Sequence, residues 1–301
     1  MIFVFQIFTP ITAQTVNAAE IYAVYVKQSG SDTNTGTAIG QEKKSLNSAY
    51  DLLGEEEACK IYVINDTTAL TAETLTLNKN QGITIEGINS DGNGNTMVAI
   101  DCDVNSKGNL FTCNGDTEYK FFAFHFPLSL GGSSDDSLIC ISNCNLTIRN
   151  CQFIRPTSNG GTVGNCLVYV DGGNLYMINV ECVDEIQNVS FSCIVYYAIN
   201  SHSVTLTNVT MKKISSSNSI VCTNGGYYDK LDMALNNCTF TECQTRSNGI
   251  LYVSSYNGES TFAIGDGGVT SFTSCSSSGY DTKSGGIYLS MSNIMSSSQL
   301  K

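Results

Sequence analysis

The sequence predicts an all-β chain that folds as a right-handed parallel β-helix, a solenoid of stacked coils, with a short capping helix near its N-terminus. A strand–Asn–strand unit returns at a constant step through the second half of the 301-residue chain. The chain has 27 glycines, only 3 prolines and 14% charged residues, which favours short strands and tight turns over long helices. Apolar and polar residues alternate at the start of each unit, as in a strand with one buried face.

The repeated unit is eight residues long, with apolar residues at positions 1, 3 and 8 and Asn or Asp at position 5. Its five copies keep a step of 29 and begin at Leu146, Leu175, Val204, Met233 and Phe262. The apolar phase slips by one residue after position 5, so the strand must bend there to keep its apolar side chains on one face. Asn accepts a left-handed backbone more readily than most other residues with a side chain. Each unit therefore predicts two strands joined by a one-residue corner.

Equal steps place equivalent residues above one another, at the roughly 4.8 Å spacing of neighbouring strands. The corner residues should form a ladder in which each side-chain amide bonds to the next; they are Asn150, Asn179, Asn208 and Asn237. Position 8 should form an interior column of Phe153, Cys182, Met211, Phe240 and Val269. Ser- and Gly-rich segments of varying length separate the units, so we expect any binding surface on that variable side.

The chain divides into three predicted parts. Residues 1–18 are interpreted as a signal peptide, because small residues and a small-x-small site follow an apolar run; a buried first strand is the alternative. Residues 19–60 should hold a first strand and a capping helix over Ser45–Glu57, with Ser45 as its N-cap. Residues 61–301 should form the coils. We expect the sequence to be truncated at its C-terminus, because no cap follows the last predicted strand.

Charge and cysteine spacing exclude several classes of ligand. The formal net charge is −12 and only three residues are arginine, so we expect no nucleic-acid partner, which would need clustered Lys and Arg. The 13 cysteines lack His neighbours at zinc-site spacing, so we expect no metal and no other cofactor. Several cysteines fall on inward positions, where a thiol acts as a small apolar group. No apolar run reaches the roughly 18 residues of a transmembrane helix.

Two parts of the sequence resemble known proteins. The segment Tyr25–Thr37, with its Ser-Gly-Ser-Asp run, is similar to the opening segment of pectin-lyase-like right-handed β-helix proteins. This resemblance implies their fold for nearly the whole chain, although a fold does not by itself imply a function.

The second resemblance concerns two late elements. Phe240-Thr-Glu-Cys243 precedes Gly249-Ile250, and Phe272-Thr-Ser-Cys275 precedes Gly286-Ile287. They resemble the repeats of polymorphic membrane proteins, whose β-helical passengers are exposed at the cell surface. The resemblance implies that this chain is secreted or displayed at the cell surface.

Candidate catalytic residues are few. Inverting glycoside hydrolysis needs two carboxylates roughly 6.5–9.5 Å apart, and Asp135-Asp136 is the one Asp-Asp pair in the sequence. A polysaccharide lyase needs a basic side chain near carboxylates that bind Ca²⁺, and Arg149 is the candidate base. A solvated loop for the aspartates and an outward strand position for Arg149 are the alternatives. His125 and His202 suggest no partner for a Ser–His–Asp triad.

Five N-x-Ser/Thr sequons occur, at Asn65, Asn145, Asn188, Asn208 and Asn237. The ladder should occupy the last two, which leaves Asn65 and Asn188 as the better acceptors for N-glycosylation.

The sequence therefore favours a non-enzymatic protein, secreted or at the cell surface, that serves adhesion, interaction or display. Its expected partners are carbohydrate or another surface protein. The alternative is a carbohydrate-active β-helix, either a polysaccharide lyase or a glycoside hydrolase, with a degenerate or unrecognised site.

Overall fold

The fold was analysed in a computed structural model. It describes residues 22–54, 58–78, 82–102, 109–125, 137–154, 166–183, 186–189, 194–198, 202–216, 218–225, 230–246, 249–255, 260–265, 268–278 and 286–291. The predicted signal peptide, residues 1–18, lies outside these ranges.

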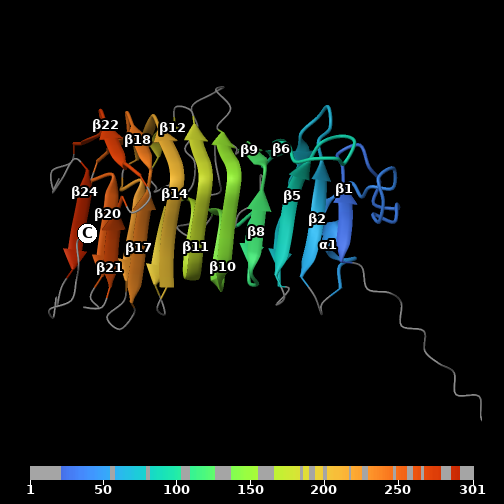
Figure 1. The fold of residues 1–301 in the computed structure, drawn as a ribbon, viewed down its shortest axis with the longest axis horizontal. Coiled ribbons are helices and arrows are strands. Elements are labelled where there is room, and N and C mark those ends of the chain that lie inside the picture. Colours follow the sequence, from blue (N-terminus) through green and yellow to red (C-terminus); the bar gives the residue numbers. More distant parts are fainter. Residues whose placement is uncertain are drawn as a thin grey trace, which may run out of the picture.

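The described chain consists mostly of β-strands, and the named strands pair in parallel (Figure 1). One sheet has twenty strands, and a second contains β12, β15, β19 and β23. The strands are β1 Ala23–Val26, β2 Cys59–Ile64, β3 Leu70–Thr71, β4 Leu75–Leu77, β5 Ile83–Ile88, β6 Val98–Asp101, β7 Phe111–Cys113, β8 Thr117–Lys120, β9 Phe122–His125, β10 Ser137–Ile154, β11 Cys166–Val183, β12 Ile186–Val189, β13 Ile194–Ala198, β14 His202–Lys212, β15 Ile214–Ser216, β16 Val221–Gly225, β17 Leu231–Asn236, β18 Thr239–Thr241, β19 Gln244–Thr245, β20 Leu251–Ser255, β21 Thr261–Ile264, β22 Ser271–Thr273, β23 Ser276–Ser277 and β24 Ile287–Met291.

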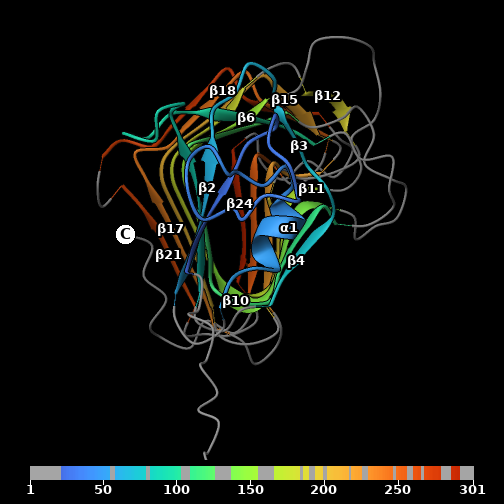
Figure 2. The same cartoon turned by 90° about the vertical axis from the view of Figure 1, so that its right-hand side faces the viewer.

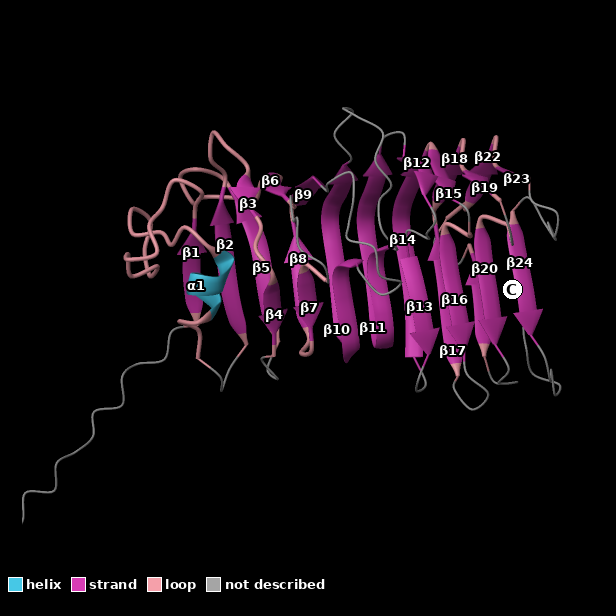
Figure 3. Cartoon of the chain, turned by 180° about the vertical axis from the view of Figure 1, so that it is seen from behind, coloured by secondary structure: helices cyan, strands magenta, loops and turns pink. Residues whose placement is uncertain are grey.

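Strands that are far apart in the sequence lie side by side, as β16, β20 and β24 do in Figure 3. The first repeat position forms one column of strand partners, and no member is more than 2% exposed: Leu146, Leu175, Val204, Met233 and Phe262. Upstream the step is irregular, because Cys59 pairs with Ile83 and Ile83 pairs with Thr117, so two successive steps differ in length. Burial of these apolar columns is the main force that holds the strands together.

The corner asparagines have left-handed backbones, with φ between 53° and 55° for Asn150, Asn179, Asn208 and Asn237. Each of the last three donates from Nδ2 to the Oδ1 of the corner asparagine one step earlier, at 2.8 Å. The ladder thus provides hydrogen-bond partners for the side-chain amides at the bends, where the strand changes direction.

The fifth repeat copy departs from the prediction. Val269 was predicted to continue the interior column after Phe240, but Phe272 pairs with Phe240 and Val269 is 79% exposed. The step lengthens here, from 29 between Leu235 and Ile264 to 32 between Thr239 and Ser271, so three additional residues lie between the two paired segments. Asp266, predicted at this corner, lies outside the described residues. Gly268 has φ 142° and packs against the side chain of Asn237. A Cβ added to Gly268 would lie 2.8 Å from the Cβ of Asn237.

Two further kinds of corner accompany the asparagine corner. Asn143 and Gly172 take left-handed backbones within β10 and β11, at equivalent positions of two paired strands. Lys213, Glu242 and Ser274 take the same conformation shortly before β15, β19 and β23 begin. A single strand label such as β10 therefore covers straight segments that meet at bends.

Cysteines follow five of these left-handed residues, and their thiols point into the interior. Each Sγ donates to a backbone oxygen of the preceding strand of the stack, at 3.1–3.6 Å; the thiols are Cys144, Cys151, Cys238, Cys243 and Cys275. A thiol suits this position because it is small, apolar and a weak hydrogen-bond donor. No disulfide joins any of the twelve cysteines in the part of the chain that the structure describes.

Helix α1, Leu46–Tyr50, lies against β1, β2 and β4, at the N-terminal end of the stack (Figure 2). The Oγ of Ser45 accepts from the backbone N–H of Ser48 at 3.2 Å, which is the predicted N-cap. The Asp32 carboxylate accepts from the backbone N–H groups of Lys44 and Ser45 and so fixes the approach to the helix. The helix is shorter than the predicted Ser45–Glu57, since it ends at its C-cap residue Asp51. In the part of the chain that the structure describes, no helix has the length and apolar character needed to cross a membrane.

Replacing Thr245 by Val should stabilise the chain by about 1 kcal/mol. Thr245 is 2% exposed, and among the described residues its Oγ1 has no hydrogen-bond partner. Thr223→Val is the matched control, because Thr223 is equally buried but donates to the backbone oxygen of Tyr252 at 3.3 Å. The control should lose about 1 kcal/mol in urea unfolding. Destabilisation by Thr245→Val would mean that this hydroxyl has a buried partner, such as water.

Candidate functional site

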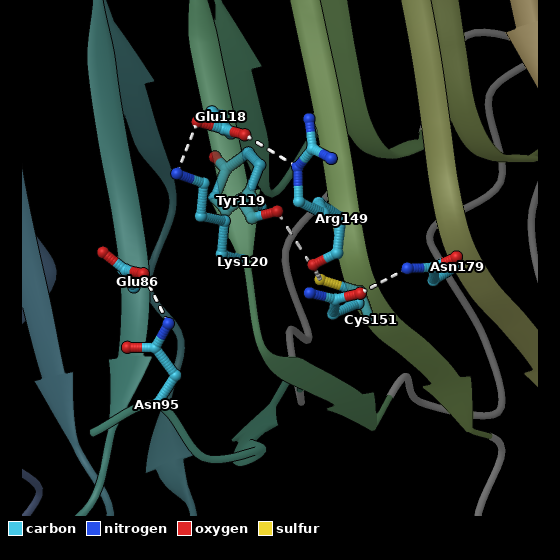
Figure 4. Close-up of polar contacts among 9 residues, drawn as sticks. Glu86, Asn95, Glu118, Tyr119, Lys120, Arg149, Cys151 and Asn179 are labelled. Carbon is cyan, nitrogen blue, oxygen red and sulfur yellow. Dashed lines mark hydrogen bonds and ion pairs between the residues drawn. The ribbon is translucent and has the colours of Figure 1, made fainter. Parts of the chain in front are cut away.

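Arg149 projects outward from β10 into a cluster of charged side chains (Figure 4). Its Nε lies 3.3 Å from Oε1 of Glu118, whose Oε2 lies 2.9 Å from Nζ of Lys120. The three side chains are 40%, 25% and 23% exposed, respectively. The Glu118 carboxylate therefore bridges the two cationic side chains at the partly exposed surface of the sheet.

Strand alternation places these groups on one face. In β8, Thr117 and Tyr119 are buried, so the residues between and after them, Glu118 and Lys120, face outward. Lys120 is the strand partner of Arg149, which puts Glu118 diagonally across from the guanidinium. Such diagonal neighbours remain within reach of long side chains.

Glu86 extends the cluster towards the N-terminal end, because it is the strand partner of Lys120. Its Oε1 accepts from Nδ2 of Asn95 at 3.0 Å, and the residue is 8% exposed (Figure 4). The buried carboxylate is thus held by an amide next to a row of outward cations.

This geometry disfavours Arg149 as a general base. A base must first lose its proton, and a guanidinium in a protein keeps it. Asp135 and Asp136, the predicted carboxylate partners, lie outside the described residues. The arrangement can hold Arg149 in a fixed orientation or bind an anionic group weakly.

A second ionisable pair was missed by the sequence analysis. His125 on β9 and Asp101 on β6 are strand partners, and Nδ1 of the imidazole lies 3.0 Å from Oδ1 of the carboxylate. Within the described residues, no hydroxyl or thiol is hydrogen-bonded to this imidazole, so the pair lacks the nucleophile of a triad. The side chain of His202 lies outside the described residues. Because the step between paired strands is irregular upstream, the pairing of His125 with Asp101 could not be predicted from the sequence repeat.

A second polar ladder also lies on the outer surface, one residue before the repeated unit. Asn145 donates from its backbone N–H and from Nδ2 to the two carboxylate oxygens of Asp116, both at 2.9 Å. Asn174 donates to Oδ1 of Asn145 at 2.7 Å and accepts from Ser203. These residues keep the same step as the repeated unit, so extending the repeat alignment upstream by one residue could have found them.

Hydrogen bonds within the two ladders determine which of the described sequon asparagines have an accessible side-chain amide. The side-chain amides of Asn145, Asn208 and Asn237 are all engaged in hydrogen bonds. Asn65 is exposed at the end of β2 and stays a candidate acceptor. The side chain of Asn188 lies outside the described residues.

The acidic, imidazole and thiol side chains are dispersed along the stack. Over the described ranges, no group of three or more His, Cys, Asp or Glu side chains is placed to hold a metal ion. Burial raises the pKa of the interior thiols, for example to about 12 for Cys151 and Cys182, so these groups remain protonated at neutral pH.

Comparisons with known proteins add no assignment. No family model matches the chain, and neither a curated protein nor a solved structure matches it.

Proposed function

We propose that the chain is a right-handed parallel β-helix, similar to the pectin-lyase-like proteins, in which α1 caps the first coil. The parallel register at a constant step supports this fold, as do the apolar columns inside and the amide ladder at one corner. The position of α1 across one end of the stack supports its role as a cap (Figure 2). Handedness is inferred from the strong preference of parallel crossovers for the right-handed form.

The function that this architecture supports best is non-enzymatic adhesion, interaction or display, by a chain that is secreted or at the cell surface. The observation that carries the proposal is the ion pair of Arg149 with Glu118, which engages the guanidinium of the candidate base with a carboxylate of the same chain. The outer ladder of Asp116, Asn145 and Asn174 adds a polar face whose groups bond to one another. Carbohydrate or another surface protein is the proposed partner.

A carbohydrate-active β-helix is the second candidate, and Arg149 beside an outward carboxylate is the observation that favours it. In that case Arg149 would orient an acidic sugar, since its protonated state excludes it as the base.

The test separates binding from turnover. The purified chain is assayed on a glycan array and on cells, and then for Ca²⁺-dependent cleavage of acidic polysaccharides. We expect binding without cleavage. Cleavage that falls at least about a hundredfold in Arg149→Ala, but persists in the matched variant Lys120→Ala, would overturn the proposal in favour of the enzyme. Both variants remove one cation from Glu118, so loss of charge alone cannot explain a difference between them.

A further inference from the structure

Two thiols face each other near the C-terminal end of the stack. Cys243 and Cys275 end the two Phe-x-x-Cys elements, and each follows a residue with a left-handed backbone. The strand partners on either side are Thr241 with Thr273 and Gln244 with Ser276. This register sets the two cysteines directly opposite each other, and the N–H of Ser276 donates to the backbone oxygen of Cys243 at 3.0 Å.

The two side chains point the same way. The Sγ of Cys243 donates to the backbone oxygen of Met211 at 3.4 Å, and the Sγ of Cys275 donates to that of Phe240 at 3.3 Å. Met211 and Phe240 are themselves strand partners, so the sulfur atoms are stacked as their acceptors are. Burial first, and then the charge and hydrogen bond of Cys275, raise the pKa of the Cys243 thiol to about 12.

We propose that Cys243 and Cys275 form a disulfide when the folded chain meets a small-molecule disulfide such as oxidised glutathione. Neighbouring strands lie roughly 4.8 Å apart, within the roughly 4.4–6.8 Å between Cα atoms that a disulfide spans. Among the described cysteines this is the one pair in register, since Cys182 faces Met211 and Cys222 faces Tyr252.

The chemistry is two thiol–disulfide exchanges. The thiolate of Cys275, which is partly exposed, attacks one sulfur of oxidised glutathione and releases one glutathione thiolate. The thiolate of Cys243 then attacks the Cys275 sulfur of the mixed disulfide and releases the second glutathione. Two cysteine thiols are oxidised, one glutathione disulfide is reduced to two thiols, and the two protons pass to solvent and the released thiolates. The second step should be slow because Cys243 is fully buried.

The bond would fasten the last described strands. Within the described residues, β21, β22, β23 and β24 pair on one side only. Phe272, Ile287 and Leu289 are only partly buried, whereas their strand partners are fully buried. A covalent link from Cys275 to Cys243 would limit fraying of these strands.

Peptide mapping under non-reducing conditions tests the proposal. The folded chain is incubated with oxidised glutathione, blocked with an alkylating agent and digested. We expect a linked peptide pair containing Cys243 and Cys275, with the mass of two hydrogens lost, and at least about tenfold slower amide exchange in β22 and β24. Dithiothreitol should reverse both effects.

The matched control is Cys238→Ser, because the Cys238 thiol also donates at a corner but faces no other thiol. The link and the slower exchange should persist in Cys238→Ser and vanish in Cys275→Ser. A stable glutathione adduct on Cys275 with Cys243 still free would overturn the proposal, as would a link that forms only in urea. The wild-type map decides the question even if a serine variant fails to fold.

Discussion

Replacing Gly173 by Ala should destabilise the chain by about 4 kcal/mol, the sum of backbone strain and steric overlap. Gly173 has φ 101° and is the strand partner of Cys144. A Cβ at Gly173 would overlap the backbone oxygen of Cys144 and lie 2.7 Å from its nitrogen. Those atoms belong to a bend within β10 and cannot move without breaking its pairing. Urea unfolding of the purified variant measures the loss.

Gly40→Ala is the matched control for this substitution. Gly40 has φ 87°, but a Cβ there would meet no atom within 4 Å. It should therefore show only the cost of a left-handed alanine, about 1–2 kcal/mol. Equal losses in the two variants would mean that backbone conformation, and not close contact with Cys144, makes glycine necessary at Gly173.

Asn179→Leu should destabilise the chain by about 3 kcal/mol. Asn179 has φ 55°, donates to Asn150 and accepts from Asn208, both at 2.8 Å. Leucine removes both hydrogen bonds and places a branched side chain on a left-handed backbone. The loss can be followed by urea unfolding, and by faster amide exchange in β11 and β14.

Asn179→Gly separates the two causes, because glycine keeps the left-handed backbone and loses only the hydrogen bonds. We expect about half the loss seen with leucine. A glycine variant as unstable as the leucine variant would show that the ladder alone matters. A fully stable glycine variant would show that its hydrogen bonds contribute nothing.

The repeated unit could be predicted because two constraints coincide at each copy. A strand partner needs the apolar alternation, and a one-residue bend needs a residue tolerant of a left-handed backbone, so Asn179 and Asn208 recur at a fixed step. The fifth copy misled the prediction because Val269 kept the apolar pattern while the step to the following strand lengthened by three residues. Lys213 and Glu242 carry no comparable signal, because their backbones are imposed by the strands they join rather than favoured by their side chains.

The charged cluster could be predicted only in part. An outward Arg149 follows from alternation within its own strand. Its partner Glu118 lies on β8, which pairs with β10 at the regular step, but the contact runs diagonally, to the residue two before the strand partner Lys120. The unit on β8 has Thr117 at its first position and Phe121 at its fifth, so its sequence does not match the repeat pattern and did not reveal the pairing. The pairing of His125 with Asp101 was missed for a different reason, because it depends on a shorter step that the later repeat does not share.

The asparagine ladder has a direction. Each amide donates towards the N-terminal end of the stack and accepts from the C-terminal side, so the three dipoles that join Asn237 to Asn150 are aligned head to tail. Aligned hydrogen bonds polarise one another, so the central hydrogen bond of the ladder should be stronger than the two terminal ones. The apolar columns inside have no such direction, because apolar packing is the same towards either end of the stack. The row of amides gives the stack an electrical polarity that its core lacks.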